Sequence, residues 1–197
     1  MAGLKLKPTK CVPLKQEVSF LSHLITPAAV KANGTKVKQV VDWPVQLSVG
    51  GVRIFMGLAS YHRKFVPYFA GIAFPLHQLS EKGKKFAWSA ECHAAFNTLK
   101  DKLSTPPILA FPDFSPSVGP FTLDTDASDL AIGAVLSQKS ANGEVVIAYA
   151  NRRLDKRERR YYITRREMLA LVYFLKHFRH YLLGKPFNVR TDHQALQ

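Results

Sequence analysis

Phe-Thr-Leu-Asp-Thr-Asp-Ala-Ser, residues 121–128, is the stretch of this 197-residue chain that decides its fold. Apolar and polar side chains alternate along its first four residues, which predicts a β-strand, and Asp126 stands at the end of that strand. Two further acidic residues occupy comparable places: Glu167 lies near the start of a long amphipathic run, and Asp192 follows the strand-like run 187–191. We therefore expect two strands and a helix to bring the three carboxylates together.

These three carboxylates suggest a metal-dependent nuclease site. Carboxylate oxygens suit hard cations such as Mg²⁺ and Mn²⁺. Such ions neutralise the charge that builds on the attacking and leaving oxygens when a phosphodiester is cleaved. Asp126, Glu167 and Asp192 are therefore the candidate metal-binding and catalytic residues. Each of them taken alone has a simpler interpretation, because an acidic residue at a strand end is often a solvated turn residue.

The sequence around these residues predicts a sheet with one long helix. We expect strands at 121–125, 131–138 and 145–150, with a turn at 140–143, which together make an antiparallel meander. A helix at 164–182 then precedes a fourth strand at 187–191, and Gly184-Lys-Pro186 separates the two. The residues that this helix is expected to bury are Met168, Leu171, Val172, Leu175 and Leu182.

The first half of the chain is predicted to be mainly helical. A strand or hairpin is expected at 16–25, and helices at 34–42, 52–66 and 70–79. Another helix should start after Ser89, a plausible N-cap, and run to Leu103. The prolines between 106 and 120 resist regular structure, so we place a domain boundary there, at residue 117. The expected fold class is α/β.

The composition favours a polyanionic partner in a reducing compartment. The formal charge of +14, from 28 basic and 14 acidic residues, attracts polyanions through counterion release, and nucleic acid is the obvious one. Cys11 and Cys92 are far apart and have no nearby metal-ligand partner, which argues against a zinc site or a disulfide framework. No apolar run is long enough to span a bilayer, so we expect no membrane partner and an intracellular location, cytoplasmic or nuclear.

Two basic stretches are candidates for contact with nucleic acid. Residues 152–166 hold eight basic and two acidic residues, although such a charge run can also be a solvated face. The run Tyr-His-Arg-Lys-Phe at 61–65 mixes aromatic and basic groups, yet a helix that buries its aromatics would look the same. The candidate nucleic-acid-binding residues are Arg63, Lys64, Arg152, Arg153, Arg157 and Arg160.

Several ordered motifs strongly resemble the Pol polyprotein of gypsy-type LTR retrotransposons. They include Phe-Met-Gly-Leu-Ala-Ser-Tyr-His-Arg-Lys-Phe-Val (55–66), Phe-Ala-Trp-Ser-Ala-Glu-Cys (86–92), Asp-Thr-Asp-Ala-Ser (124–128), Glu-Met-Leu-Ala-Leu-Val (167–172) and Val-Arg-Thr-Asp-His-Gln-Ala-Leu (189–196). The resemblance implies three parts: the end of a reverse transcriptase palm with its primer-grip hairpin (1–33), thumb and connection helices (34–117), and a ribonuclease H-like domain (118–197) that is truncated at its C-terminus. That domain would be an incomplete mixed sheet with a long packed helix.

The resemblance also implies a chemistry and a substrate. It places Asp126, Glu167 and Asp192 at three metal-binding positions of a site that uses two Mg²⁺ or Mn²⁺ ions to hydrolyse the RNA strand of an RNA·DNA hybrid. The family motif puts the ligand immediately before Ala-Ser, which selects Asp126 over Asp124. The paired polymerase aspartates and a fourth nuclease carboxylate are expected to lie outside this chain, in the remainder of a Pol polyprotein.

Two other classes of function stay open at this point. The chain could be a nucleic-acid-binding module without catalysis, or an inactive relic of a retroelement. Departures from the family pattern fit the second alternative: Ser22 stands where the primer-grip motif usually has glycine, Gly50-Gly51 interrupts a helix start, and Arg165-Arg166 replaces a more acidic pair.

Overall fold

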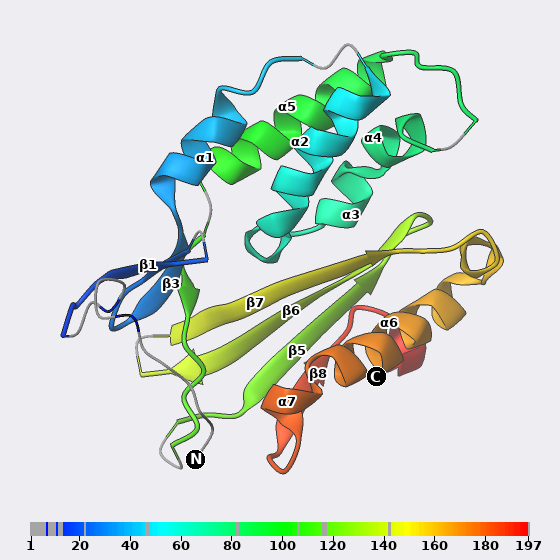
Figure 1. The fold of residues 1–197 in the computed structure, drawn as a ribbon. Coiled ribbons are helices and arrows are strands. Elements are labelled where there is room, and N and C mark those ends of the chain that lie inside the picture. The colour runs from blue at the N-terminus through cyan, green and yellow to red at the C-terminus, as the bar shows by residue number, and fades with distance from the viewer. Residues whose placement is uncertain are drawn as a thin grey trace.

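A four-stranded mixed sheet forms the centre of the C-terminal part (Figure 1). The computed structural model describes residues 7, 11, 14–21, 23–45, 48–81, 83–105, 107–115, 118–141 and 143–196. The strands are β5 (Phe121–Ala127), β6 (Ala131–Ser140), β7 (Gly143–Arg153) and β8 (Phe187–Arg190), in the order β7-β6-β5-β8. β5, β6 and β7 pair antiparallel, and β8 pairs parallel with β5. The predicted meander and its added fourth strand are confirmed.

One face of this sheet is covered by α6 (Ile163–His177) and the short α7 (Arg179–Leu182) (Figure 1). Phe121, Leu123 and Ala127 alternate onto that face, where they share a core with Ala170 and Phe174. Two details of the predicted helix are wrong. It is interrupted at Phe178, and Met168 and Val172 are each 44% exposed rather than buried.

The physical reason is that α6 turns a different side toward the sheet than the one predicted. The helix turns Glu167, Ala170 and Phe174 toward the sheet, at spacings of three and four residues. Ala170 is small and lets the helix axis approach the strands, while Phe174 fills the space beside it. Leu171 and Leu175 are only half-buried, and Leu182 is buried as expected.

The helical segment has its own core above the sheet (Figure 1). Its elements are α1 (Gly34–Val41), α2 (Val49–Tyr61), the short 3-10 helix η2 (Arg63–Phe65), α3 (Phe69–Ile72), α4 (Phe74–Leu79) and α5 (Ala90–Ser104). As predicted, Ser89 caps α5, since its hydroxyl accepts a hydrogen bond from the backbone N–H of Cys92. The rings of buried Phe55 in α2 and Phe96 in α5 have their centres 4.5 Å apart, and Leu99 is buried in the same core.

Two predicted helices of this segment differ in the structure. The helix expected at 52–66 starts earlier, because the Ser48 hydroxyl accepts a hydrogen bond from Gly51 N–H and so defines the start despite the glycine pair. It also ends at Tyr61, after which η2 continues as a separate turn. The helix expected at 70–79 is divided at Ala73 into α3 and α4.

A second, small sheet lies at the N-terminal end of the described chain. It has the order β1-β2-β3-β4, with β1 (Val18–Phe20), β2 (His23–Ile25), β3 (Ala29–Ala32) and β4 (Leu109–Ala110). The sequence predicted the β1–β2 hairpin but missed β3 and β4. β3 pairs with β2 on one side and with the distant β4 on the other, where Ala29 lies opposite Ala110. Most of the expected palm segment (3–11), Ser22 and the boundary residue 117 lie outside the described residues.

The helical segment contacts the face of the sheet opposite to α6. Alternation places Asp124, Asp126 and Gly133 on that face, and η2 and α3 pack against β6 and β7 there. An ion pair of 2.8 Å between Arg153 and Glu81 joins the two parts at one edge. Among the helices that the structure describes, none is long and apolar enough to cross a membrane.

Candidate metal centre

Three carboxylates from three elements converge at one end of the sheet. Asp126 comes from β5, Glu167 from the first turns of α6, and Asp192 from the residues that follow β8. One ligand oxygen from each lies within 4.8 Å of the other two. Because β5 and β8 run parallel and Asp124 pairs with Arg190, the residues two positions further along the chain, Asp126 and Asp192, lie side by side. The structure thus brings together all three acidic residues that the sequence selected.

Glu167 is the buried member of this cluster. Its side chain is 3% exposed, and Oε1 accepts a hydrogen bond of 3.1 Å from the backbone N–H of Ala127. Oε2 is buried and has no hydrogen-bond partner within the described part of the chain. Burial raises the pKa of Glu167, and the charges of Asp126 and Asp192 raise it further, against the lowering effect of the Ala127 N–H. A buried carboxylate oxygen with no donor is a suitable ligand for a cation.

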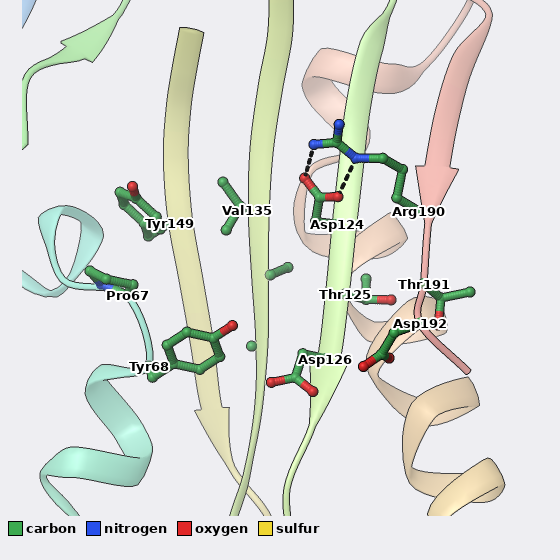
Figure 2. A pocket seen from close by; sticks show the side chains of 12 residues that line it. Pro67, Tyr68, Asp124, Thr125, Asp126, Val135, Tyr149, Arg190, Thr191 and Asp192 are labelled. Atoms are coloured by element: carbon green, nitrogen blue, oxygen red, sulfur yellow. Dashed lines mark hydrogen bonds and ion pairs between the residues drawn. The ribbon is translucent and has the colours of Figure 1, made fainter. Parts of the chain in front are cut away.

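Asp124 is excluded from the cluster by an ion pair. Arg190 donates to both of its carboxylate oxygens, Nε to Oδ1 at 2.5 Å and Nη2 to Oδ2 at 2.7 Å (Figure 2). The same guanidinium donates to Glu144 at 2.6 Å and 3.0 Å, and these two carboxylates raise the pKa of Arg190. Asp124 and Asp126 share a face of β5, but only Asp126 remains available to a metal ion.

A cavity of about 480 Å³ opens beside Asp126 and Asp192 on the sheet face opposite to α6 (Figure 2). Its wall includes Tyr149 of β7, Arg190 of β8 and Tyr68 of the helical segment. Sequence reasoning missed Arg190 and Tyr68. Arg190 had a signal, since it shares the Val-Arg-Thr-Asp-His frame with Asp192, but Tyr68 lies 58 positions before Asp126 and had none.

The predicted nucleic-acid-binding residues divide into two groups. Arg152 donates to both carboxylate oxygens of Glu158, at 2.9 and 3.0 Å, and Arg153 pairs with Glu81, so these two charges are already compensated within the chain. Lys64 is partly buried, with Nζ 5.2 Å from the centre of the Phe65 ring.

The second group faces solvent. Arg63, Arg157 and Arg160 are exposed, and no ion pair joins their side chains to another residue among those the structure describes. Of the six candidates, these three therefore have charge to offer a phosphate backbone.

A mixed sheet with a packed helix and clustered carboxylates at its end defines a ribonuclease H-like domain. The chain belongs to the family of RNase H-like domains found in reverse transcriptase. The match to this family covers residues 88–189. This match confirms the resemblance that the motifs indicated.

The relatives that the chain matches in sequence are polyproteins much longer than this chain. The chain is 43% identical over 197 residues to the Retrovirus-related Pol polyprotein from transposon 297 of Drosophila melanogaster, covering all of this chain and 18% of that protein. It is 37% identical to the Pol polyprotein from transposon 412 of the same organism (98% of this chain, 15% of that protein). It is 33% identical to the Tf2-3 polyprotein of Schizosaccharomyces pombe, covering 99% of this chain and 15% of that protein. The chain thus spans less than a fifth of each of these three polyproteins.

Solved structures agree on the fold. The foamy viral protease-reverse transcriptase in complex with RNA/DNA hybrid matches with a TM-score of 0.74 and 21% identity, over 93% of this chain and 25% of that one. The foamy viral protease-reverse transcriptase dRH in complex with double-stranded DNA matches with a TM-score of 0.75 and 22% identity, over 93% of this chain and 32% of that one. At this level of identity the likeness shows the α/β fold alone.

Proposed function

We propose that this chain carries the cation-dependent site that hydrolyses the RNA strand of RNA·DNA hybrids in a retrotransposon Pol protein. The observation that carries the proposal is the convergence of Asp126, Glu167 and Asp192, with Glu167 Oε2 buried and unpartnered among the described residues. A cluster of three carboxylates without a cation is electrostatically unfavourable, so its assembly by two strands and a helix points to an ion.

The donor set fits Mg²⁺ or Mn²⁺. All three ligands are carboxylates, the oxygen chemistry that hard divalent cations prefer, and no histidine or cysteine belongs to the cluster within the described residues. Asp126, Glu167 and Asp192 would hold the ions, two in the enzymes that the chain resembles. When bound, the ions would supply charge for the attacking and leaving oxygens of the phosphodiester.

The residues of the chain itself divide the remaining work. The Ala127 N–H binds one oxygen of Glu167 and leaves the other, Oε2, without a donor among the described residues. Asp192 is exposed, so the cluster is open to a strand arriving from solvent. Arg190 holds Asp124 away from the site and compensates its charge, which keeps a fourth carboxylate from competing for the cation. The exposed Arg63, Arg157 and Arg160 would attract the phosphate backbone.

A cleavage assay with matched aspartate variants tests the proposal. The full chain is incubated with an end-labelled RNA·DNA hybrid in Mg²⁺, in Mn²⁺ and in EDTA, together with Asp126→Asn and Asp124→Asn. We expect divalent-dependent cleavage of the RNA strand that Asp126→Asn abolishes. Asp124→Asn changes the same atoms two residues away on the same face and should retain most of the cleavage.

The other outcomes separate the alternative functions. Binding of the hybrid that weakens with salt, without any cleavage, would overturn the proposed activity and leave a nucleic-acid-binding module. Neither binding nor cleavage would favour an inactive relic. Equal cleavage by wild type and Asp126→Asn would show that the activity arises elsewhere.

A further inference from the structure

Tyr68 has an unusual backbone for an aromatic residue. It lies between η2 and α3 with φ 56° and ψ 24°, in the left-handed region that bulky side chains rarely adopt. Its side chain is 58% exposed, so burial in a core does not offset the strain. Strained residues of this kind cluster at binding and catalytic sites, where the surrounding structure holds them in place for function.

The strained backbone places the Tyr68 ring over the sheet. Gly133 lies opposite in β6, paired with Asp126, and a Cβ added to Gly133 would be 3.6 Å from Tyr68 Cδ1 and 3.7 Å from Cε1. At these distances the ring would be in ordinary van der Waals contact with such a Cβ, so the ring lies over the β6 backbone at Gly133. This aromatic side chain comes from the helical segment and forms one wall of the cavity beside the carboxylates.

Tyr68 and Asp126 lie on opposite sides of this cavity, and the ring of Tyr68 carries its hydroxyl on the side of the strands (Figure 2). No hydrogen bond or ion pair joins it to any of the residues drawn there. A tyrosine hydroxyl is protonated at neutral pH and can donate a hydrogen bond, and burial raises the pKa of Tyr68 further. The hydroxyl is therefore an uncharged hydrogen-bond donor next to the carboxylates. It can bind a phosphate oxygen once divalent cations offset the negative charge of the carboxylates and the phosphate.

We propose that Tyr68 is a substrate-contacting residue whose hydroxyl donates a hydrogen bond to a phosphodiester oxygen of the strand bound at the carboxylate cluster. This inference rests on the proposed function and extends it. The ring, held against Gly133, sets the position of the donor, and the hydroxyl adds a contact that none of the three carboxylates can make. The binding site is therefore built from both parts of the chain, with carboxylates from the sheet side and a donor from the helical segment.

The test separates the hydroxyl, the ring and the backbone of Tyr68. Tyr68→Phe removes only the hydroxyl, whereas Tyr68→Asn removes the ring but accepts the left-handed backbone. Tyr181→Phe is the matched control, because it makes the same chemical change on α7, at a side chain that lies outside the cavity and outside both basic stretches. Cleavage of the labelled RNA·DNA hybrid is measured in Mg²⁺ over a range of substrate concentrations, and hybrid affinity is followed by fluorescence anisotropy.

Loss of a hydrogen bond to a charged oxygen should raise the KM of Tyr68→Phe by roughly tenfold or more, and weaken hybrid binding by a similar factor. The melting temperature of Tyr68→Phe, and its rise on adding Mg²⁺, should match those of wild type, because the proposed hydroxyl contact is to the substrate and not to the cation. Tyr68→Asn should show at least the same rise in KM without a lower melting temperature.

Two results would overturn the inference in different ways. If wild type cleaves the hybrid and the KM and affinity of Tyr68→Phe stay within twofold of it, Tyr68 makes no substrate contact while the proposed function stands. If wild type neither cleaves the hybrid nor binds it in a Mg²⁺-dependent manner, the proposed function fails and this inference fails with it.

Discussion

Asp126→Asn should stabilise the metal-free protein while weakening its response to metal. The substitution keeps the shape of the side chain and removes one of three negative charges whose ligand oxygens lie within 4.8 Å of each other. At 4.8 Å, two unit charges repel by about 3.5 kcal/mol at an effective dielectric constant of about 20, and by about 0.9 kcal/mol in bulk water.

The environment of each partner decides which figure applies. Glu167 is 3% exposed, so its repulsion with Asp126 lies toward the larger value, while Asp192 is exposed and its contribution is screened. We expect a net gain of about 1–3 kcal/mol for Asp126→Asn in the absence of divalent ions. For a chain of this length that corresponds to a melting temperature higher by about 2–12 °C.

Thermal unfolding in EDTA and in Mg²⁺ measures both effects. Wild type should gain about 2.7 kcal/mol when Mg²⁺ is present at about 100 times its dissociation constant, and Asp126→Asn should gain much less. Asp124→Asn is the control of opposite sign, because it breaks a partly exposed ion pair with Arg190 and should be neutral or destabilising by up to about 1 kcal/mol. A lower melting temperature for Asp126→Asn in EDTA would refute the repulsion argument, and an equal Mg²⁺ response in wild type and Asp126→Asn would refute the metal site.

Two further predictions concern the core and the response to acid. Phe174→Ala should lower the free energy of unfolding in urea by about 3–5 kcal/mol, because Phe174 is 0% exposed beneath the sheet. Met168→Ala on the same helix should lower it by less than about 1 kcal/mol. Equal losses for the two variants would contradict the observed orientation of α6. Burial, followed by the positive charges of Lys64 and His62, lowers the pKa of His23 from 6.5 to about 4, so its contribution to stability is complete above pH 6.5 and is lost as the pH falls toward 4. His23→Phe should therefore reduce the loss of stability between those pH values in urea titrations, and an unchanged pH profile would rule this out.

The carboxylate cluster shows how far sequence reasoning reached. Asp126, Glu167 and Asp192 were selected from their frames, and the structure brings their oxygens together. The resemblance to a family motif chose Asp126 over Asp124, although alternation alone places both on one face. The physical reason for the choice is Arg190, which binds Asp124 from the neighbouring strand, and only the parallel pairing of β5 and β8 brings that arginine within reach.

Errors in the predicted elements have a common origin. The pattern of 164–182 contains two apolar stripes, and the sequence favoured the one with larger aliphatic side chains, including Met168 and Val172. The tertiary structure buries the other stripe, because Glu167 must reach the cluster and Ala170 permits a close approach to the sheet. In the same way, β3 and β4 follow from pairing rather than from a local pattern: β3 lies between β2 and β4, and β4 has two residues.

The sequence by itself determined the family, the order of the main strands and helices, and the acidic residues of the candidate site, because periodicity and motif frames are local properties of the chain. Only the tertiary structure decided which stripe of α6 is buried, which arginines remain unpaired among the described residues, and that Tyr68 lies beside Asp126. These are contacts between segments far apart in sequence. They depend on the register of the sheet and on the way the helical segment packs against it, and neither leaves a local pattern in the residues that meet.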